Sequence, residues 1–215
     1  MRITKIEQQK KNPLRQNIYA DGEFVLGVSV ETLLKAGLRT GDEIGSERLK
    51  SLLQVEETSN AKRIALRFLS RRPRTIKEIR DKLRQNEFSE TEVVQTIESL
   101  KQAGLVNDAE FARMYVRDAL AMKGIGNILL KRKLLLLGVD KAIVEEVISE
   151  SFEDVDERNT ALEAGRRFLK KSTATRKASD KMRLRHRLSS FLGRRGYNWE
   201  IVSSVVKELL NEDER

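Results

Sequence analysis

One block of similar sequence occurs three times in this chain, and this repeat constrains the fold more than any other feature. Residues 61–97 match the residues 51 positions further along without a gap, so that Leu83 falls on Leu134. A further shift of 58 positions places Leu192 at the same point of a third copy. A period of this length is typical of stacked helical units, each of which packs on its neighbours.

Each copy carries the same signal for the start of a helix. Ser89, Asp140 and Asn198 occupy equivalent positions, and their side-chain oxygens can accept hydrogen bonds from the free N–H groups of a first turn. An apolar residue precedes each of them, and another follows five positions after that residue, which is the pattern of a hydrophobic staple. In the first copy Glu92 completes a Ser-x-x-Glu capping box. Three helix starts in one register indicate structural repeats.

A module of a different kind precedes the repeats, over residues 1–55. Asp21-Gly22 lies between two strand-like segments of alternating character, which is a strong signal for a β-hairpin because a type I′ turn needs positive φ at both central positions. Short helices are expected at Val30–Ala36 and Ser46–Leu53, separated by glycines. The sequence therefore predicts a small β-hairpin module with two short helices.

The predicted fold class is mainly α, with three tandem three-helix repeats in an elongated array after the hairpin module. The predicted repeats span residues 56–107, 108–153 and 154–215. The expected helices are Ala61–Ser70, Thr75–Gln85 and Glu90–Ala103 in the first repeat, Ala109–Met122, Asn127–Leu137 and Lys141–Ser151 in the second, and Asp156–Lys171, Ser179–Leu192 and Trp199–Asn211 in the third. Because a unit of about 50 residues is marginally stable alone, stacking is expected to supply part of its stability.

Residues that carry catalysis or bind metals are scarce. The chain has no cysteine and one histidine, His186, so the common soft-ligand metal sites are not expected. The glycines at 124 and 126 follow a helix rather than a strand, so this segment is interpreted as a turn between helices and not as a phosphate-binding loop. We therefore expect a protein that is not an enzyme and needs no cofactor or metal.

The same inventory indicates a compartment. The absence of cysteine suits a reducing cytosol, and the N-terminus lacks the apolar segment of a signal peptide. The longest run of strong hydrophobes, Leu134–Leu137, is far shorter than the roughly 20 residues that span a bilayer. A soluble, cytoplasmic protein without membrane contact is expected.

Positive charge is concentrated in two stretches. Residues 62–84 hold ten Lys and Arg against two acidic residues, and residues 166–195 hold twelve against one. With a formal net charge of +9, the chain is expected to bind a polyanion or an acidic protein surface. The candidate contact residues are Arg71, Arg72, Arg74, Lys77, Lys131, Arg132, Lys133, Lys170, Lys171, Arg176, Lys177, Arg183, Arg185, Arg187, Arg194 and Arg195. Few aromatic residues lie among them, which argues against base stacking on single strands.

Two segments resemble the RecX family. Gly104-Leu105-Val106-Asn107-Asp108-Ala109-Glu110-Phe111-Ala112 is similar to the hallmark segment of that family, and Ala65–Leu83, with Arg72, Arg74 and Glu78, is similar to the stretch before it. The resemblance covers about residues 56–215, and the hairpin resembles the leading module of longer members. Position 107 is Asn where many relatives carry an acidic residue. Since both residue types cap helices, no functional change is expected.

The resemblance implies a non-catalytic regulator of the recombinase RecA. RecX proteins bind the RecA–DNA filament along its helical groove and usually inhibit it, restraining ATP hydrolysis and strand exchange. The implied fold consists of three-helix units related to the helix-turn-helix. The implied partners are the RecA filament and, through the basic residues, single- and double-stranded DNA, bound without sequence specificity and in a salt-sensitive manner. The chain is expected to act as a monomer.

An alternative is a helix-turn-helix DNA-binding protein that acts without RecA. In that reading the third helix of each repeat would enter the major groove. The three candidate helices are acidic or neutral, whereas a recognition helix normally carries residues such as Arg, Asn or Gln that read base edges. Charge therefore disfavours specific operator binding.

Overall fold

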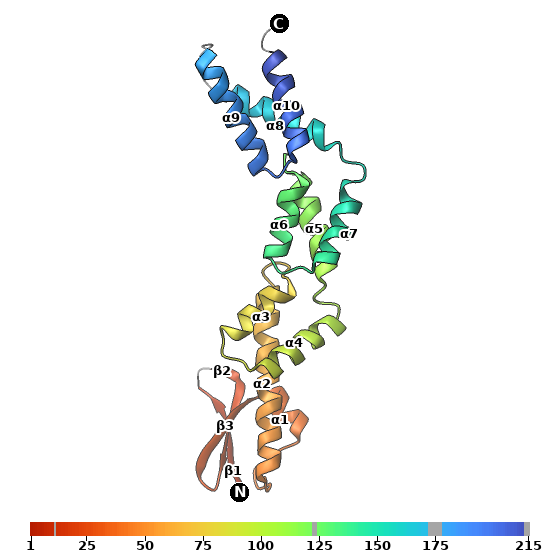
Figure 1. Cartoon of the computed structure of the whole chain (residues 1–215). Helices are drawn as coiled ribbons and strands as arrows, with labels where there is room; N and C mark the ends of the chain where they lie inside the picture. The colour runs from red at the N-terminus through yellow and green to blue at the C-terminus, as the bar shows by residue number, and fades with distance from the viewer. Residues whose placement is uncertain (11, 122–123, 172–177, 213–215) are drawn as a thin grey trace. The chain divides into compact units, whose positions relative to one another are not determined.

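The computed structural model describes the chain except for residues 11, 122–123, 172–177 and 213–215 (Figure 1). The described residues form two compact units. The first consists of residues 1–73 and 79–105, and the second of residues 74–78 and 106–215. The mainly α-helical class with an N-terminal β module is confirmed, whereas the repeat boundaries and the elongated array stay predictions.

The first unit begins with a three-stranded antiparallel sheet in the order β1-β2-β3, formed by Ile3–Gln9, Asn12–Ala20 and Glu23–Ser29. The predicted turn is confirmed, because Asp21 and Gly22 both have positive φ, 49° and 88°. The predicted hairpin corresponds to β2 and β3. The sheet is larger than that hairpin, because β1 also pairs along β2. Ile3, Ile18 and Leu26 are buried from the three strands, so the third strand adds an apolar side chain to the core of this module.

Helix α1 is Val30–Ala36, as predicted, and α2 is a single helix over Ser46–Leu69. The prediction of separate helices at Ser46–Leu53 and Ala61–Ser70 was therefore wrong, and α2 crosses the predicted module boundary at residue 55. No glycine or proline interrupts this stretch. Within this helix the Thr58 hydroxyl donates to the Gln54 carbonyl one turn earlier, at 2.9 Å, so this polar side chain is satisfied without interrupting the helix.

Glu56 fixes α2 against the β module. Its side chain is buried, with 6% of the residue exposed. The carboxylate accepts a hydrogen bond from the Ser29 backbone N–H at 2.8 Å and pairs with the Arg15 guanidinium at 2.9 Å. A buried carboxylate needs such partners, so one side chain joins the strands, the start of α1 and the middle of α2.

The first unit closes with α4, Glu90–Gln102, and with most of α3, which spans Ile76–Arg84 and begins in the second unit. The predicted capping box is confirmed, because the Ser89 side chain accepts from the Glu92 backbone and the Glu92 side chain accepts from the Ser89 backbone. Apolar residues at helical spacing from both helices, among them Leu83 and Leu100, are fully buried. This local chemistry explains why the sequence located these two helices closely.

The second unit holds α5 (Asp108–Ala121), α6 (Asn127–Leu136), α7 (Lys141–Phe152), α8 (Glu157–Lys170), α9 (Ala178–Arg194) and α10 (Trp199–Glu212). The predicted end of the first of these helices, Met122, lies outside the described residues. The other predicted starts and ends agree with these helices to within two residues. The predicted N-caps are also confirmed, as Asp140 accepts from the Ala142 backbone and Asn198 from the Ile201 backbone, both at 2.8 Å. One apolar core lies among α5–α7 and another among α8–α10.

A hydrogen-bonded contact, called a joint below, recurs where one repeat meets the next. Both examples lie within the second unit. The Thr75 hydroxyl, just before α3, donates to the Leu137 carbonyl at 2.7 Å. At the equivalent place before α6, the Gly126 N–H donates to the Arg195 carbonyl at 2.8 Å. Each accepting carbonyl is followed by a glycine of positive φ, Gly138 or Gly196. The repeated sequence thus produces a repeated contact between repeats.

A carboxylate from the following repeat completes each joint. Asp108 accepts a hydrogen bond from the Ile76 N–H at 2.9 Å, and Glu157 accepts one from the Asn127 N–H at 2.8 Å. Both donors lie at the first residue of a helix, where N–H groups lack intrahelical partners and a negative charge is favourable. The start of the second helix of a repeat is therefore capped by the repeat that follows it.

Removing the Glu157 cap should cost stability only when its hydrogen-bonding oxygen is lost. Burial raises the pKa of this carboxyl above its usual value, and the Asn127 backbone N–H opposes that rise. Glu157→Ala is expected to cost about 1 kcal/mol, the usual worth of an N-cap. Glu157→Gln should cost less than half as much, because the amide keeps an acceptor oxygen and no charge is buried. Urea unfolding of both variants measures this, and equal losses would contradict it.

Candidate interaction surface

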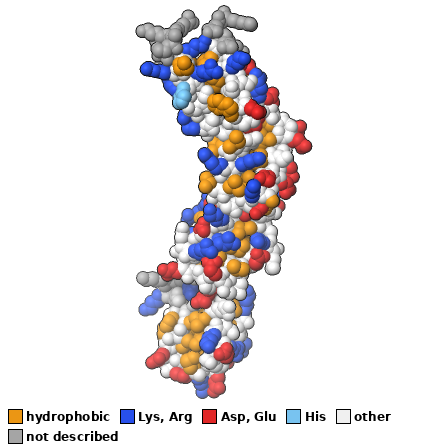
Figure 2. Space-filling view, viewed as in Figure 1, with side chains coloured by type: hydrophobic (Ala, Val, Ile, Leu, Met, Phe, Trp, Pro, Cys, Tyr) orange, Lys and Arg blue, Asp and Glu red, His pale blue; other side chains and the backbone are white. Residues whose placement is uncertain are grey.

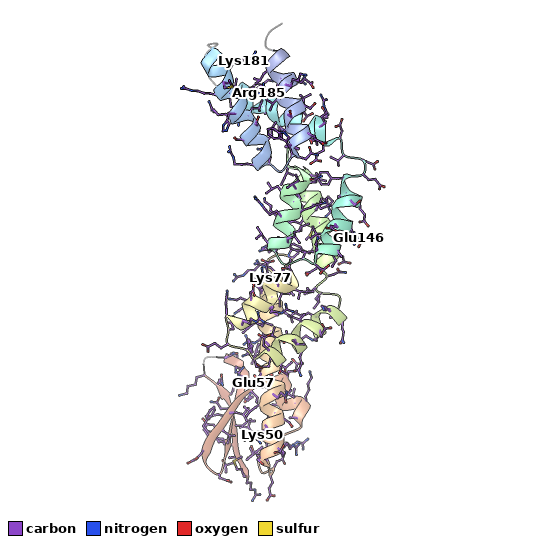
Figure 3. All side chains as sticks on the ribbon, in the orientation of Figure 1. Lys50, Glu57, Lys77, Glu146, Lys181 and Arg185 are labelled. Atoms are coloured by element: carbon purple, nitrogen blue, oxygen red, sulfur yellow. The ribbon has the colours of Figure 1, made fainter. Side chains whose placement is uncertain are left out.

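Helix α9 presents its arginines on two flanks. Arg183, Arg187 and Arg194 follow one flank at spacings of four and seven residues, which lie one above another on a helix. Arg185, labelled on α9 in Figure 3, lies on the opposite flank, because two residues turn a helix by about 200°. All four are exposed, and none forms an ion pair with a described residue. The arginines predicted on this helix thus form a line of three and a separate fourth.

Two aromatic rings hold part of this basic surface in place. Phe168 of α8 and Phe191 of α9 stack with their ring centroids 4.6 Å apart. The Arg187 guanidinium lies 5.9 Å from the Phe168 centroid, and the Arg195 guanidinium lies 4.7 Å from the Phe191 centroid. Such cation–π contacts orient an arginine without neutralising its charge, so Arg187 is positioned and still positive.

Two of the predicted contact residues serve the fold. Arg195 donates to the Gly124 carbonyl at 2.5 Å, beside the joint between the second and third repeats. The Arg74 side chain is 13% exposed and pairs with Glu78 at 3.2 Å. An arginine that is bonded within the fold and only partly exposed has less to offer a partner, so both are weaker candidates than the α9 arginines.

The other predicted residues are distributed over both units. Arg71 and Arg72 are exposed after α2 in the first unit, and Arg132 and Lys133 are exposed on α6 beside the half-buried Lys131. Lys170 and Lys171 are exposed at the end of α8. Lys77, labelled in Figure 3, reaches back from α3 to the Leu136 carbonyl, at 3.2 Å. Arg176 and Lys177 lie outside the described residues.

Three acidic side chains elsewhere in the second unit pair with arginines. Arg113 of α5 contacts Glu146 and Glu150 of α7, both at 3.2 Å. Arg158 of α8 pairs with Glu208 of α10. On the face shown in Figure 2, Lys and Arg side chains gather over α8–α10. The α9 arginines, by contrast, have no acidic partner among the described residues, so their positive charge is not compensated by such a pair.

The glycine segment before α6 is a turn between helices, as predicted. A phosphate-binding loop needs a free helix N-terminus, but the Asn127 N–H already donates to Glu157 and the Ile128 N–H to the Gly196 carbonyl. Within the described residues, no cluster of His, Asp and Glu could hold a metal ion. His186 is exposed on α9. Among the described helices, none is both long and apolar enough to cross a bilayer.

A groove in the first unit was not predicted from the sequence. It is lined by β2, α1, α2 and α4, and its basic residues include Lys62, Arg63 and Arg67 of α2. A signal was present, because Val55, Ser59, Lys62 and Leu66 follow one face of a helix at spacings of four, three and four. That signal was hidden by the incorrect break in α2, which divided the face between two predicted helices.

Comparisons with known proteins agree along the chain. Three family models match, described as the regulatory protein RecX N-terminal domain, over residues 1–45, and as the first and second three-helix domains of RecX, over residues 61–100 and 107–148. The regulatory protein RecX of Clostridium perfringens strain SM101 is 34% identical over 212 residues, which cover 99% of this chain and 98% of that protein. That of Clostridium beijerinckii is 31% identical, covering 99% and 97%.

Two solved structures share the fold. A crystal structure of regulatory protein RecX superposes with a TM-score of 0.70 at 22% identity, covering 95% of this chain and 98% of that one. A crystal structure of RecX from Lactobacillus salivarius gives a TM-score of 0.59 at 24% identity, covering 72% and 97%. At this level of identity the structures support the architecture and nothing finer.

Proposed function

Because this chain belongs to the RecX family of regulatory proteins, we propose that it binds the RecA–DNA filament and inhibits RecA's ATP hydrolysis, strand exchange and filament growth. The observation that carries the proposal is the line of exposed arginines on α9, Arg183, Arg187 and Arg194, without acidic partners among the described residues. A nucleoprotein filament offers phosphates and acidic protein surface along its length, and arginine binds both by charge-assisted hydrogen bonds.

The direct test measures ATP hydrolysis by RecA on single-stranded DNA as this protein is added. Hydrolysis should fall at ratios well below one protein per RecA, since loss of filament growth affects many subunits at once. If the protein leaves hydrolysis unchanged and instead protects one duplex sequence from cleavage, it acts as a helix-turn-helix DNA-binding protein without RecA. That second function has little support here, because exposed carboxylates, Glu146 and Glu150, lie on α7, one of the candidate recognition helices.

Neutralising the α9 line should weaken the proposed binding. The triple variant Arg183→Gln, Arg187→Gln and Arg194→Gln is expected to lose about tenfold in affinity for DNA at 0.1 M salt, because each lost phosphate contact also loses its counterion release. The slope of log affinity against log salt should fall by about one per contact removed. Fluorescence anisotropy with a labelled duplex at several salt concentrations measures both quantities.

The matched control is Arg185→Gln, which removes one charge from the opposite flank of the same helix. It should change affinity by less than twofold and leave the salt slope nearly unaltered. If Arg185→Gln and the triple variant have equal effects per charge removed, net charge rather than the flank directs binding. If neither variant alters DNA or filament binding, α9 is not the contact surface.

A further inference from the structure

The groove in the first unit has the features of a protein-docking site and is formed by other residues than those of the proposed function. Its volume is about 1430 Å³, and it is lined by parts of β2, α1, α2 and α4. These elements all belong to the first compact unit. Figure 1 shows α2 running beside α1 and the sheet, which places residues far apart in sequence around one groove.

Four large apolar side chains line this groove although they are exposed to solvent. Leu14 of β2 is 73% exposed and Leu34 of α1 is 75% exposed, while Val55 and Leu66 of α2 are 49% and 39% exposed. Single exposed leucines are ordinary on protein surfaces, but several lining one concave surface mark a contact site. The groove therefore offers apolar anchor points along α2 and across from it.

Positive charge accompanies these apolar residues. Lys62, Arg63 and Arg67 line the groove, and in the described part of the chain none of them pairs with a carboxylate. Lys62 donates to the Ser99 hydroxyl at 3.0 Å and Arg63 to the Asn60 side chain at 2.5 Å. Both bonds hold the cations at the groove without neutralising them.

The acidic residues of the groove are already engaged. Glu56 is buried and pairs with Arg15 at 2.9 Å. Glu31 pairs with Lys35 at 2.6 Å, and that hydrogen bond, with the charge of Lys35, lowers the pKa of its carboxyl. The charge of Lys62 also contributes to lowering the pKa of the Glu31 carboxyl. Lys62, Arg63 and Arg67 nevertheless form no ion pair among the described residues, and with Arg15 and Lys35 they outnumber the two carboxylates of the lining. The groove therefore has an excess of positive charge and is complementary to a negatively charged occupant.

We infer that this groove binds an acidic segment of a partner protein, one in which apolar side chains alternate with carboxylates. Carboxylates would meet Lys62, Arg63 and Arg67, and the apolar side chains would cover Leu34 and Leu66. This is a recurrent mode of peptide recognition, with an apolar groove for affinity and basic residues for charge. The inference concerns a second surface, beyond the α9 arginines.

Two other occupants fit less well. A nucleic acid would satisfy the cations, but among the described residues no aromatic side chain lines the groove for base stacking, and a phosphate backbone leaves exposed leucines uncovered. A second copy of this chain would bring the same three cations against themselves in a symmetric contact, which is repulsive. An acidic, partly apolar peptide would both satisfy the cations and cover the exposed leucines of the lining.

The test uses the full chain and a fluorescein-labelled 12-residue peptide of alternating Leu and Glu. Two further probes are a peptide of the same length made only of Glu and a labelled DNA duplex. Fluorescence anisotropy should show binding of the Leu-Glu peptide that Leu34→Ser with Leu66→Ser weakens at least tenfold. The same double variant should bind duplex DNA as the unaltered chain does, because it changes no charge.

Matched variants separate the two features of the groove. Arg63→Gln with Arg67→Gln should weaken the Leu-Glu peptide about tenfold, while Lys50→Gln, on α2 but outside the groove lining, should leave it unchanged. Leu136→Ser, an exposed leucine of α6, is the apolar control and should also have no effect. Circular dichroism confirms that each variant keeps its helix content.

Several results would overturn the inference. Failure of the Leu-Glu peptide to bind, or binding that the groove variants do not alter, rules out this occupant. If the groove cation variants weaken duplex DNA while the leucine variants change nothing, the surface binds nucleic acid. The triple α9 variant should retain peptide binding, so a failed α9 prediction and a failed groove prediction are distinguishable.

Discussion

Replacing Gly196 with alanine is expected to destabilise the second unit by about 3 kcal/mol or more, the scale of a strained backbone combined with a steric clash. The residue has φ of +86°, a conformation that costs an alanine roughly 1 kcal/mol or more. A Cβ at this position would also lie 2.3 Å from the backbone nitrogen and Cβ of Leu129. The Leu129 backbone cannot avoid this clash by a change of rotamer. Relieving the clash therefore requires the second and third repeats to separate at the joint.

Two other glycines supply the controls for Gly196→Ala. Gly104 also has positive φ, +66°, but an added Cβ meets nothing within 4 Å, so Gly104→Ala reports the conformational cost alone. Gly193 lies in α9 with open space around it, and Gly193→Ala should be neutral or stabilising because alanine favours a helix. Urea unfolding gives the three free energies. If Gly196→Ala costs no more than Gly104→Ala, close approach is not what requires glycine at the joint.

The position equivalent to Gly138 and Gly196 in the first repeat clarifies the role of these glycines. The 51-residue offset places Glu87 there, and it too has positive φ, 63°. Glu87 is exposed, whereas an added Cβ at Gly138 would lie 2.3 Å from the Lys77 side chain. The backbone turn therefore recurs in all three repeats, but glycine is required only where the helix of another repeat approaches it.

The helices of the repeats could be predicted from sequence because their signals are local. Ser89, Asp140 and Asn198 each cap a helix through atoms two or three residues away, and the apolar positions between them follow a helical period. The joint could not be predicted in the same way. Its bonds connect residues far apart in the sequence: Thr75 and Leu137 are 62 positions apart, and Asn127 and Glu157 are 30 apart. A local sequence pattern does not predict which distant residues will pair.

The candidate surface also combines features that the sequence predicts with features that only the structure reveals. Charge counts located the basic stretches, but they could not separate an arginine used by the fold from one left free. Arg195 bonds to a carbonyl 71 positions away, and Arg74 is enclosed beside Glu78. Arg183 and Arg187 look no different in sequence, yet both are exposed. Only the packing around each guanidinium distinguishes structural arginines from those available to a partner.

The repeated apolar core leads to a prediction about equivalent leucines. Leu83, Leu134 and Leu192 occupy the same place in the three repeats, and each is 0% exposed. Leu134→Ala is expected to lower the free energy of unfolding by about 2–5 kcal/mol, because the variant loses buried apolar contacts and leaves a cavity. Leu192→Ala should cost a similar amount, since each repeat of a stacked array contributes its own share of stability. Urea unfolding followed by circular dichroism measures both losses.

Leu136 provides a control on the same helix as Leu134. It is 69% exposed, so Leu136→Ala removes the same atoms from a side chain that contributes little to the core. That variant should change the free energy of unfolding by less than about 0.5 kcal/mol, as surface substitutions usually do. Similar losses for Leu134→Ala and Leu136→Ala would mean that helix propensity, and not burial, sets the cost. The difference between the two variants therefore isolates the contribution of the core position that the repeat preserves.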